Sequence, residues 1–285
     1  MTGAVYLLDK AAGITSRKAA AAVARAFSFK KYGHCGTLDP DATGLLVVIL
    51  GKATRLAPYI SGSTKRYSFD IVFGISTDTL DMSGEILSEV NCASLTTSLI
   101  QEKLPQFTGL LQQQVPRFSA VRVDGKRGYK LAREGKEVEM PSREVTVTNW
   151  AIDSLQNKRI SCEVTVSTGT YIRALARDIG VSLGFPSVAD NIRRTKVGNF
   201  LLAESAVESD NPEALISMAE AMKEYPAVIV PDEYIQGLFH GNAFPASVEE
   251  IAIALNHNQE LIAIGIGDGK VFQPKVVLAD QEKKV

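Results

Sequence analysis

The sequence predicts an α+β protein, in which a large domain on a mixed or antiparallel sheet is followed by a small β-barrel unit. Two observations carry this prediction. Over the first 225 residues, strand-like segments of alternating hydrophobicity are interspersed with segments of helical periodicity. Beyond Glu224-Tyr225-Pro226, short apolar runs separated by Gly, Asn and Asp take over. We therefore expect a catalytic domain at residues 1–225 and a second domain at 226–285.

The expected elements follow along the chain. A strand is expected at residues 4–9, and Thr15 or Ser16 can cap a helix over the alanine-rich residues 19–27. The continuous apolar run at 45–50 indicates a buried element. Periodicity predicts further strands at 67–75, 144–152 and 160–167, and helices at 95–104, 171–183 and 212–223. The C-terminal unit should hold strands at 227–230, 251–255, 260–266 and 270–272, with Gly267-Asp268-Gly269 as a hairpin turn.

Composition limits the class of protein. With 285 residues and 45% hydrophobic content, the chain can bury a full core. Its apolar runs are shorter than a membrane span, so no membrane partner is expected. The three cysteines are widely spaced and form no C-x-x-C pair, which is typical of free thiols in a reducing compartment. We expect a cytoplasmic monomer.

The net charge of −1 averages two opposed regions. Residues 1–66 hold ten Lys and Arg against three Asp, whereas the residues after 196 hold five Lys against fourteen acidic residues. Neutralising phosphates requires only local positive charge. The sequence therefore permits a basic nucleic-acid groove on one part of the molecule.

The most informative segment is residues 33–46, Gly-His-Cys-Gly-Thr-Leu-Asp-Pro-Asp-Ala-Thr-Gly-Leu-Leu. Pro40 disfavours the α conformation for Asp39 and keeps it extended, while the glycines let a substrate approach the backbone closely. An isolated Asp-Pro pair is usually a turn. Here the segment places a carboxylate on an anchored, exposed loop, where it can do chemistry.

This segment resembles the catalytic motif of the TruB family, the bacterial tRNA pseudouridine synthases that modify uridine 55 of the T loop. Further segments match family motifs in the family's order: residues 8–16, 65–67, 77–84, 114–120, 125–135, 169–173 and 192–198. Residues 261–278 are similar to the PUA-like RNA-binding domain that many of these enzymes carry. The chain departs from the family pattern at Ala11, Cys35, Arg117, Phe118 and Arg122.

The resemblance implies isomerisation of uridine 55 in the T arm of tRNA. The reaction breaks the N1 glycosidic bond, turns the bound base, and joins C5 to C1′. It involves no redox change and no external group, so we expect no cofactor. The sequence also lacks clustered metal ligands, so we expect no metal. Because the uridine lies in a folded loop, the enzyme must flip it out.

The resemblance also implies three catalytic residues. Asp39 would stabilise or trap the positive charge that develops at the sugar. Attack at C1′, addition to C6 of the base, and proton removal at C2′ remain alternatives for this step. Arg173 matches the arginine that pairs with the aspartate, since an unpaired anion in a dry pocket is costly. Tyr171 matches the tyrosine placed against the uracil, where it can accept the C5 proton.

A second set of residues is expected to bind the substrate. Tyr67 matches the tyrosine that stacks on the target base. His34 matches the histidine that occupies the position vacated by the flipped base. RNA contacts are also expected from Lys10, Arg66, Ile192 and Arg193.

Three alternative functions remain open. The chain could be a non-catalytic protein of the same fold that binds or folds tRNA. It could be a synthase guided by a separate RNA, as in archaeal and eukaryotic relatives. It could also be a glycoside hydrolase that pairs Asp39 with Asp81.

Overall fold

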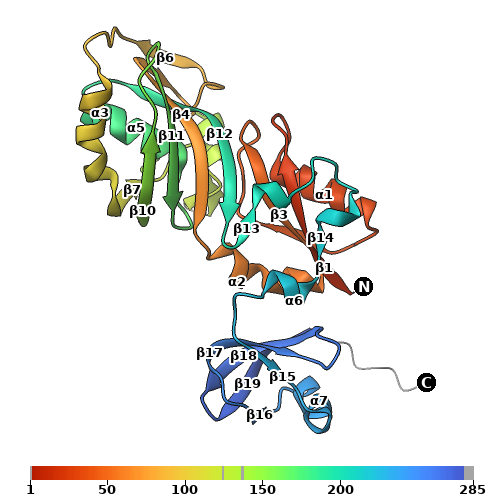
Figure 1. The fold of residues 1–285 in the computed structure, drawn as a ribbon. Coiled ribbons are helices and arrows are strands. Elements are labelled where there is room, and N and C mark those ends of the chain that lie inside the picture. The colour runs from red at the N-terminus through yellow and green to blue at the C-terminus, as the bar shows by residue number, and fades with distance from the viewer. Residues whose placement is uncertain (1, 124, 136–137, 279–285) are drawn as a thin grey trace.

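The computed structural model describes residues 2–123, 125–135 and 138–278. Within these ranges the main body is a ten-stranded sheet in the order β14-β1-β3-β12-β4-β11-β10-β7, with β2 beside β3 and β13 beside β12 (Figure 1). Its strands are β1 (Gly3–Lys10), β2 (Tyr32–Cys35), β3 (Thr43–Gly51), β4 (Lys65–Phe73), β7 (Gly109–Gln114), β10 (Ser142–Ile152), β11 (Arg159–Val166), β12 (Ser187–Val197), β13 (Phe200–Leu201) and β14 (Leu215–Ile216). The pairing of β12 with β3 is parallel and the neighbouring pairings are antiparallel. The predicted α+β class with a mixed sheet is confirmed.

Two helices cover the two halves of this sheet (Figure 1). Helix α1 (Ser16–Ala26) begins where Thr15 accepts a hydrogen bond from the Lys18 N–H, and its small buried residues pack on β1 and β3. Helix α5 (Ile172–Ser182) buries its apolar residues against β4, β11 and β12. Other helices in the described ranges are α2 (Ala57–Ser61), α3 (Thr97–Lys103), α4 (Gly128–Arg133), α6 (Met218–Ala221) and α7 (Asp232–Phe239), with 3₁₀ turns at Lys52–Leu56, Leu104–Phe107, Leu202–Glu204 and Pro212–Ala214.

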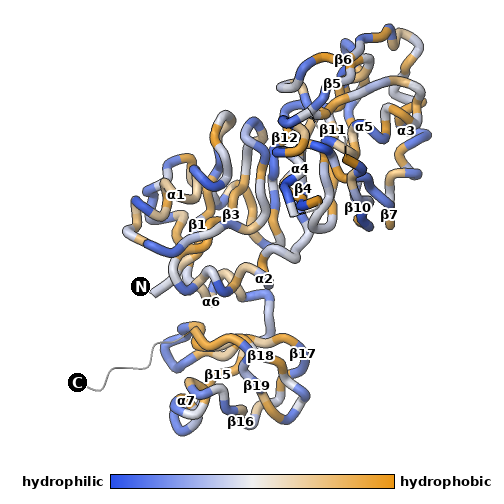
Figure 2. The backbone as a smooth tube through the Cα atoms, turned by 180° about the vertical axis from the view of Figure 1, so that it is seen from behind, coloured by the Kyte–Doolittle hydropathy of each residue, from blue (hydrophilic) through white to orange (hydrophobic). Residues whose placement is uncertain are grey.

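Smaller sheets complete the fold. One ribbon pairs β5 (Ile75–Thr77) with β6 (Ile86–Glu89), and another pairs β8 (Arg122–Val123) with β9 (Lys126–Arg127). The C-terminal part is a curled five-stranded sheet with the order β15-β17-β18-β19-β16. Figure 2 shows that its strands are largely hydrophobic. They are β15 (Ala227–Ile229), β16 (Phe244–Pro245), β17 (Glu249–Leu255), β18 (Leu261–Asp268) and β19 (Val271–Val277).

The C-terminal sheet shares a hydrophobic core with the main body. Leu56 and Ile60, from the segment before β4, belong to the same buried cluster as Ile253 and Leu261. The guanidinium of Arg55 also donates a hydrogen bond to a backbone carbonyl of β19, at residue 277. The two parts therefore stabilise one another. The division at residues 225/226 stays a prediction, and residues 279–285 of the expected second domain lie outside the described residues.

The structure differs from the sequence-based prediction at several elements, and it adds α7 to a C-terminal unit for which only strands were expected. The helix expected at 212–223 is wrong: a 3₁₀ turn, the short β14 and the short α6 occupy that range. Strand β12 was not expected, because its charged residues mask the alternation. Strand β18 runs two residues beyond the expected 260–266, to Asp268, so the hairpin turn lies at Gly269-Lys270; the Asp268 carboxylate accepts hydrogen bonds from the N–H groups of Lys270 and Val271. No helix in the described ranges is long and apolar enough to cross a bilayer.

Candidate active site

The loop that carries Asp39 connects β2 to β3 and is held from two sides. The hydroxyl of Ser16 donates to the Leu38 carbonyl and accepts from the Leu38 N–H, both at 2.8 Å. The ammonium of Lys10 donates to the Pro40 carbonyl at 2.9 Å and to two further carbonyls. These bonds fix the backbone on both sides of Asp39, so its carboxylate projects from a rigid support.

The other side of the loop rests on a buried arginine of β12. Arg194 donates to the carbonyls of Gly36 and Leu45, at 3.0 and 2.8 Å. Gly44 pairs with Arg194 across the parallel β3–β12 contact, where a Cβ atom would lie 2.3 Å from the Arg194 carbonyl oxygen. Because Gly44 also has a φ of +95°, only glycine suits this close approach.

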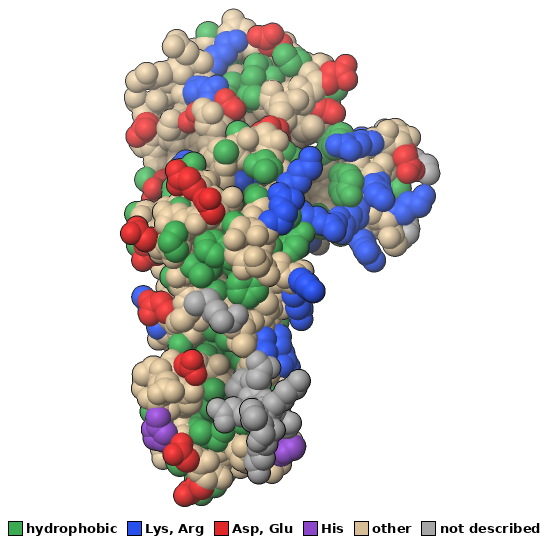
Figure 3. Space-filling view, turned by 90° about the vertical axis from the view of Figure 1, so that its right-hand side faces the viewer, with side chains coloured by type: hydrophobic (Ala, Val, Ile, Leu, Met, Phe, Trp, Pro, Cys, Tyr) green, Lys and Arg blue, Asp and Glu red, His purple; other side chains and the backbone are tan. Residues whose placement is uncertain are grey.

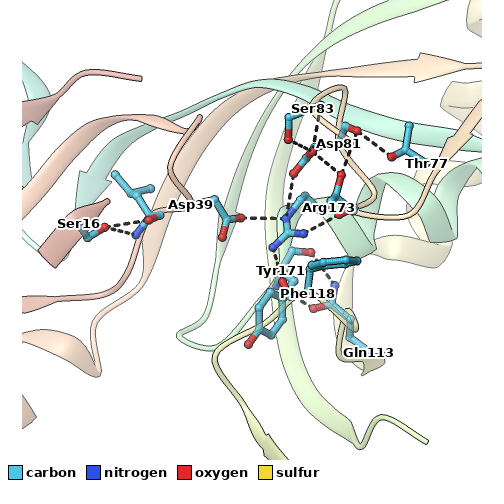
Figure 4. Close-up of polar contacts among 11 residues, drawn as sticks. Ser16, Asp39, Thr77, Asp81, Ser83, Gln113, Phe118, Tyr171 and Arg173 are labelled. Carbon is cyan, nitrogen blue, oxygen red and sulfur yellow. Dashed lines mark hydrogen bonds and ion pairs between the residues drawn. The ribbon is translucent and has the colours of Figure 1, made fainter. Parts of the chain in front are cut away.

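Arg173 and Asp39 form the ion pair at the centre of the site (Figure 4). Nε of Arg173 donates to Oδ2 of Asp39 at 2.8 Å. The arginine side chain is only 5% exposed, and its other nitrogens donate to the carbonyls of Thr79 at 2.6 Å and Phe118 at 2.9 Å. The Asp39 side chain is 44% exposed. A buried, fully engaged cation therefore presents a carboxylate that a substrate can reach.

A cavity of about 230 Å³ lies beside this ion pair. Its walls combine the Asp39 loop, the start of α5, strands β4 and β12, and residues 119–120. It therefore forms where the two halves of the sheet meet. Tyr67, Tyr171 and Ile192 line it together with Asp39 and Arg173.

Two buried cations that sequence reasoning did not place here also line the cavity. One is Arg194, and the other is Lys65, whose ammonium donates to the carbonyls of Ser61 and Ser63. Burial, together with the charge of Arg194, lowers the pKa of Lys65 to about 8. The positive charges favour an anionic substrate group in the cavity.

The comparisons with known proteins agree on one family. A family model described as TruB family pseudouridylate synthase (N terminal domain) matches residues 24–172. The tRNA pseudouridine synthase B of Streptococcus thermophilus is 34% identical over 292 residues, which cover 98% of this chain and 100% of that protein. The protein of the same name from Caldanaerobacter subterraneus subsp. tengcongensis is 36% identical over 274 residues, 93% of this chain and 95% of the relative. The chain belongs to the TruB family of pseudouridylate synthases.

Solved structures show the same fold. A chain in an H/ACA RNP bound to a substrate RNA containing 2'-deoxyuridine matches with a TM-score of 0.73 and 20% identity, over 98% of this chain and 86% of that chain. A chain in a Cbf5-Nop10-Gar1 complex matches with a TM-score of 0.72 and 23% identity, over 97% and 85%. Because these matches cover nearly the whole chain, the shared fold includes the C-terminal sheet.

The structure places the remaining candidate residues of this TruB-family chain outside the cavity. Lys10 is 1% exposed and its ammonium bonds only to nearby carbonyls in the described structure, which does not suit an RNA contact. Arg193 makes a two-pronged ion pair with Asp9, at 3.0 and 2.6 Å, and stays partly exposed. Arg66 is exposed on β4, 3.7 Å from a glutamate of β11.

His34 lies on β2, opposite Val48 of β3, and does not line the cavity. Burial lowers its pKa, and its Nδ1 atom is buried without a hydrogen-bond partner. The described residues contain no group of three or more His, Cys, Asp or Glu that could hold a metal ion.

Proposed function

We propose that the protein isomerises uridine 55 in the T loop of tRNA to pseudouridine. The observation that carries this proposal is the ion pair of Asp39 with the buried Arg173 at the edge of a cavity that also presents Tyr67 and Tyr171. Pseudouridine formation needs a fixed carboxylate beside the sugar, an aromatic surface for the base and a proton acceptor near C5. The presence of Asp39, Tyr67 and Tyr171 in one cavity supports these three roles, and the names of the relatives support tRNA as the substrate.

In this proposal the uridine leaves its stack and enters the cavity. Flipping a base costs a few kcal/mol of stacking. Stacking on Tyr67 offsets part of this cost, at roughly 1–3 kcal/mol for a base on an aromatic ring. His34 would occupy the position that the flipped base leaves in the T loop of the RNA. To do so, its side chain must move outward from its half-buried place on β2.

Asp39 would then act on the reacting sugar and base. Loss of the N1–C1′ bond builds positive charge at the sugar, which the carboxylate stabilises or traps. Arg173 holds the carboxylate in place through Nε and is itself held by the Thr79 and Phe118 carbonyls. Tyr171 accepts the proton that leaves C5 once the new C5–C1′ bond has formed. N1 of the turned base takes up a proton from solvent in exchange for the one lost from C5, so the atoms balance and the proposed reaction uses no cofactor.

Exposed basic residues would hold the RNA backbone. Figure 3 shows Lys and Arg side chains gathered on a protruding part of the molecule. The β8–β9 ribbon and α4 contribute exposed cations around one hollow, namely Arg122, Lys126, Arg127 and Lys130. Arg66 and the partly exposed Arg193 add charge nearer the cavity. Such contacts position the RNA without reading its sequence.

The glycoside hydrolase alternative is disfavoured by the position of Asp81. A hydrolase of that kind needs two carboxylates that flank the scissile bond. Asp81 does not line the cavity, and its Oδ1 atom accepts hydrogen bonds from Thr79 and Ser83. Its Oδ2 atom lies 3.6 Å from Nε of Arg173. Asp81 therefore supports the arginine.

The test is tritium release from T-arm RNA labelled at C5 of its uridines. The parent protein should release tritium only when uridine 55 is present, without releasing free uracil. Asp39→Asn should fold and bind the RNA but release no tritium, because the amide keeps the shape and removes the anion. Asp41→Asn, an exposed position in the same loop, is the matched control and should behave like the parent. Turnover by purified Asp39→Asn would refute the catalytic role.

A further inference from the structure

Gln113 is a buried amide at the end of an edge strand. Its neighbours Gln112 and Gln114 on β7 are exposed, as strand alternation requires, whereas Gln113 is only 2% exposed. Burying an amide is costly unless its polar atoms are hydrogen-bonded. The contacts of this side chain therefore explain why a glutamine occupies a core position.

Both polar atoms of the Gln113 amide bind the backbone of Tyr171. The Tyr171 N–H donates to Oε1 of Gln113 at 2.8 Å, and Nε2 of Gln113 donates to the Tyr171 carbonyl at 3.1 Å (Figure 4). Tyr171 is the residue that precedes α5, and its backbone is extended, with φ −103° and ψ 112°. One side chain thus holds the two groups that set the direction of the Tyr171 side chain.

The strand next to β7 holds the ring of the same tyrosine. Arg143 of β10 is the cross-strand partner of Gln113, and its guanidinium carbon lies 5.5 Å from the centre of the Tyr171 ring. A guanidinium over an aromatic face is attractive. The cross-strand pair of Gln113 and Arg143 therefore contacts both the backbone and the ring of Tyr171.

The segment that follows β7 also contacts Arg173, the partner of Asp39 in the ion pair. Arg173 lies two residues beyond Tyr171, and its Nη2 atom donates to the carbonyl of Phe118, in the segment that follows β7. The end of β7 and the residues after it thus hold the start of α5 at two points. Moving the Tyr171 backbone would displace both the phenol and the guanidinium that orients Asp39.

We propose that Gln113 is a positioning residue for the isomerisation, acting through Tyr171 and, by way of the α5 backbone, Arg173. This inference rests on the proposed function. Gln113 does not line the cavity, so it acts without touching the substrate. Displacing a reacting group by about 1 Å can cost about 100-fold in rate.

Two variants test this role. Gln113→Leu keeps a similar volume and removes both hydrogen bonds. Gln113→Asn keeps the amide but is one methylene too short to make both bonds, so it guards against a leucine variant that does not fold. Gln112→Leu, on the same strand with an exposed side chain, is the matched control. Single-turnover rates at saturating enzyme, RNA affinity and thermal unfolding are measured for each protein.

We expect both Gln113 variants to slow the single-turnover rate by about 10- to 100-fold. Their affinity for T-arm RNA should stay within about twofold of the parent, because Gln113 is buried and does not line the cavity. Gln112→Leu should match the parent in both measurements. A Gln113→Asn rate within about threefold of the parent, or a loss confined to RNA affinity, would overturn the positioning role. If the parent itself forms no pseudouridine, the proposed function fails. If the parent is active and the Gln113 variants keep its rate, only this inference fails.

Discussion

Replacing Arg173 by lysine keeps the positive charge but removes the planar arrangement of donors. Three donors of Arg173 point to three separate oxygens, those of Asp39, Thr79 and Phe118. An ammonium is a point charge that cannot reproduce the spread of a guanidinium. Arg173→Lys should therefore leave at least one of the two backbone carbonyls unpaired and loosen Asp39.

The size of the effect follows from the exposure of the partners. A hydrogen bond from a charged donor to a carbonyl contributes about 1.5–3 kcal/mol net. The ion pair with the half-exposed Asp39 contributes no more than about 1 kcal/mol because solvent screens it. Together the variant should lose about 2–4 kcal/mol of the free energy of unfolding. For a chain of this size that lowers Tm by roughly 4–8 °C.

Thermal unfolding and single-turnover kinetics together test this reasoning. Besides the Tm shift, the rate should fall by about 100-fold, because Asp39 is no longer held in one position. Arg177→Lys, one turn later on α5, is the matched control: its Nε atom binds the neighbouring Asp178, and its side chain is partly exposed. An Arg173→Lys protein with a Tm within about 2 °C of the parent and a rate within about threefold would refute the argument.

Three further predictions concern Tyr171, the C-terminal sheet and His34. Tyr171→Phe keeps the ring under Arg143 and removes the phenolic oxygen, so single-turnover isomerisation should fall by at least about 100-fold; a near-parental rate would show that another group accepts the C5 proton. A chain cut after Tyr225 should still convert RNA at saturating enzyme but bind it more weakly, and its lower Tm should reflect the core lost beside Leu56 and Ile60. If that protein unfolds cooperatively yet forms no product, the C-terminal sheet helps to build the active site. Burial lowers the pKa of His34, so the unfolded state binds more protons below its ordinary pKa and the parent loses stability as the pH falls. His34→Gln should therefore show a smaller drop in Tm between about pH 7.5 and about pH 5.5; an equal drop in Tm would contradict this.

Local sequence was sufficient for elements whose signal lies within a few residues. The Thr15 cap and the alanines that follow specify α1 wherever it packs. Alternation predicted β4, β10 and β11, because each has one face on the core. The sequence did not predict β12, because its residues that pair with β3 and β4 in the middle of the sheet include Asp190, Arg193 and Arg194. Their charges are satisfied by partners distant in sequence, and periodicity cannot reveal such partners.

The direction of each cationic side chain depended on contacts from other parts of the chain. Sequence suggested Lys10 as an RNA contact, yet it is buried and donates to a carbonyl of the Asp39 loop, as the buried Arg194 does from the other side. A run of three glutamines offered a weak signal for Gln113, since only the middle one faces the core. Its partner lies 58 residues away. No local pattern could have identified that pair.

The sequence by itself determined which residues are available for chemistry. The extended loop at Asp39 and the Tyr-x-Arg spacing at the start of α5 are local properties, set by Pro40, by glycine and by the identities of a few neighbours. Only the tertiary structure decided that these segments meet, because they belong to two halves of a sheet joined through β12. The physical reason is that burial and hydrogen-bond partners are properties of packing: a lysine binds a phosphate or supports a loop according to which oxygens the fold brings within reach.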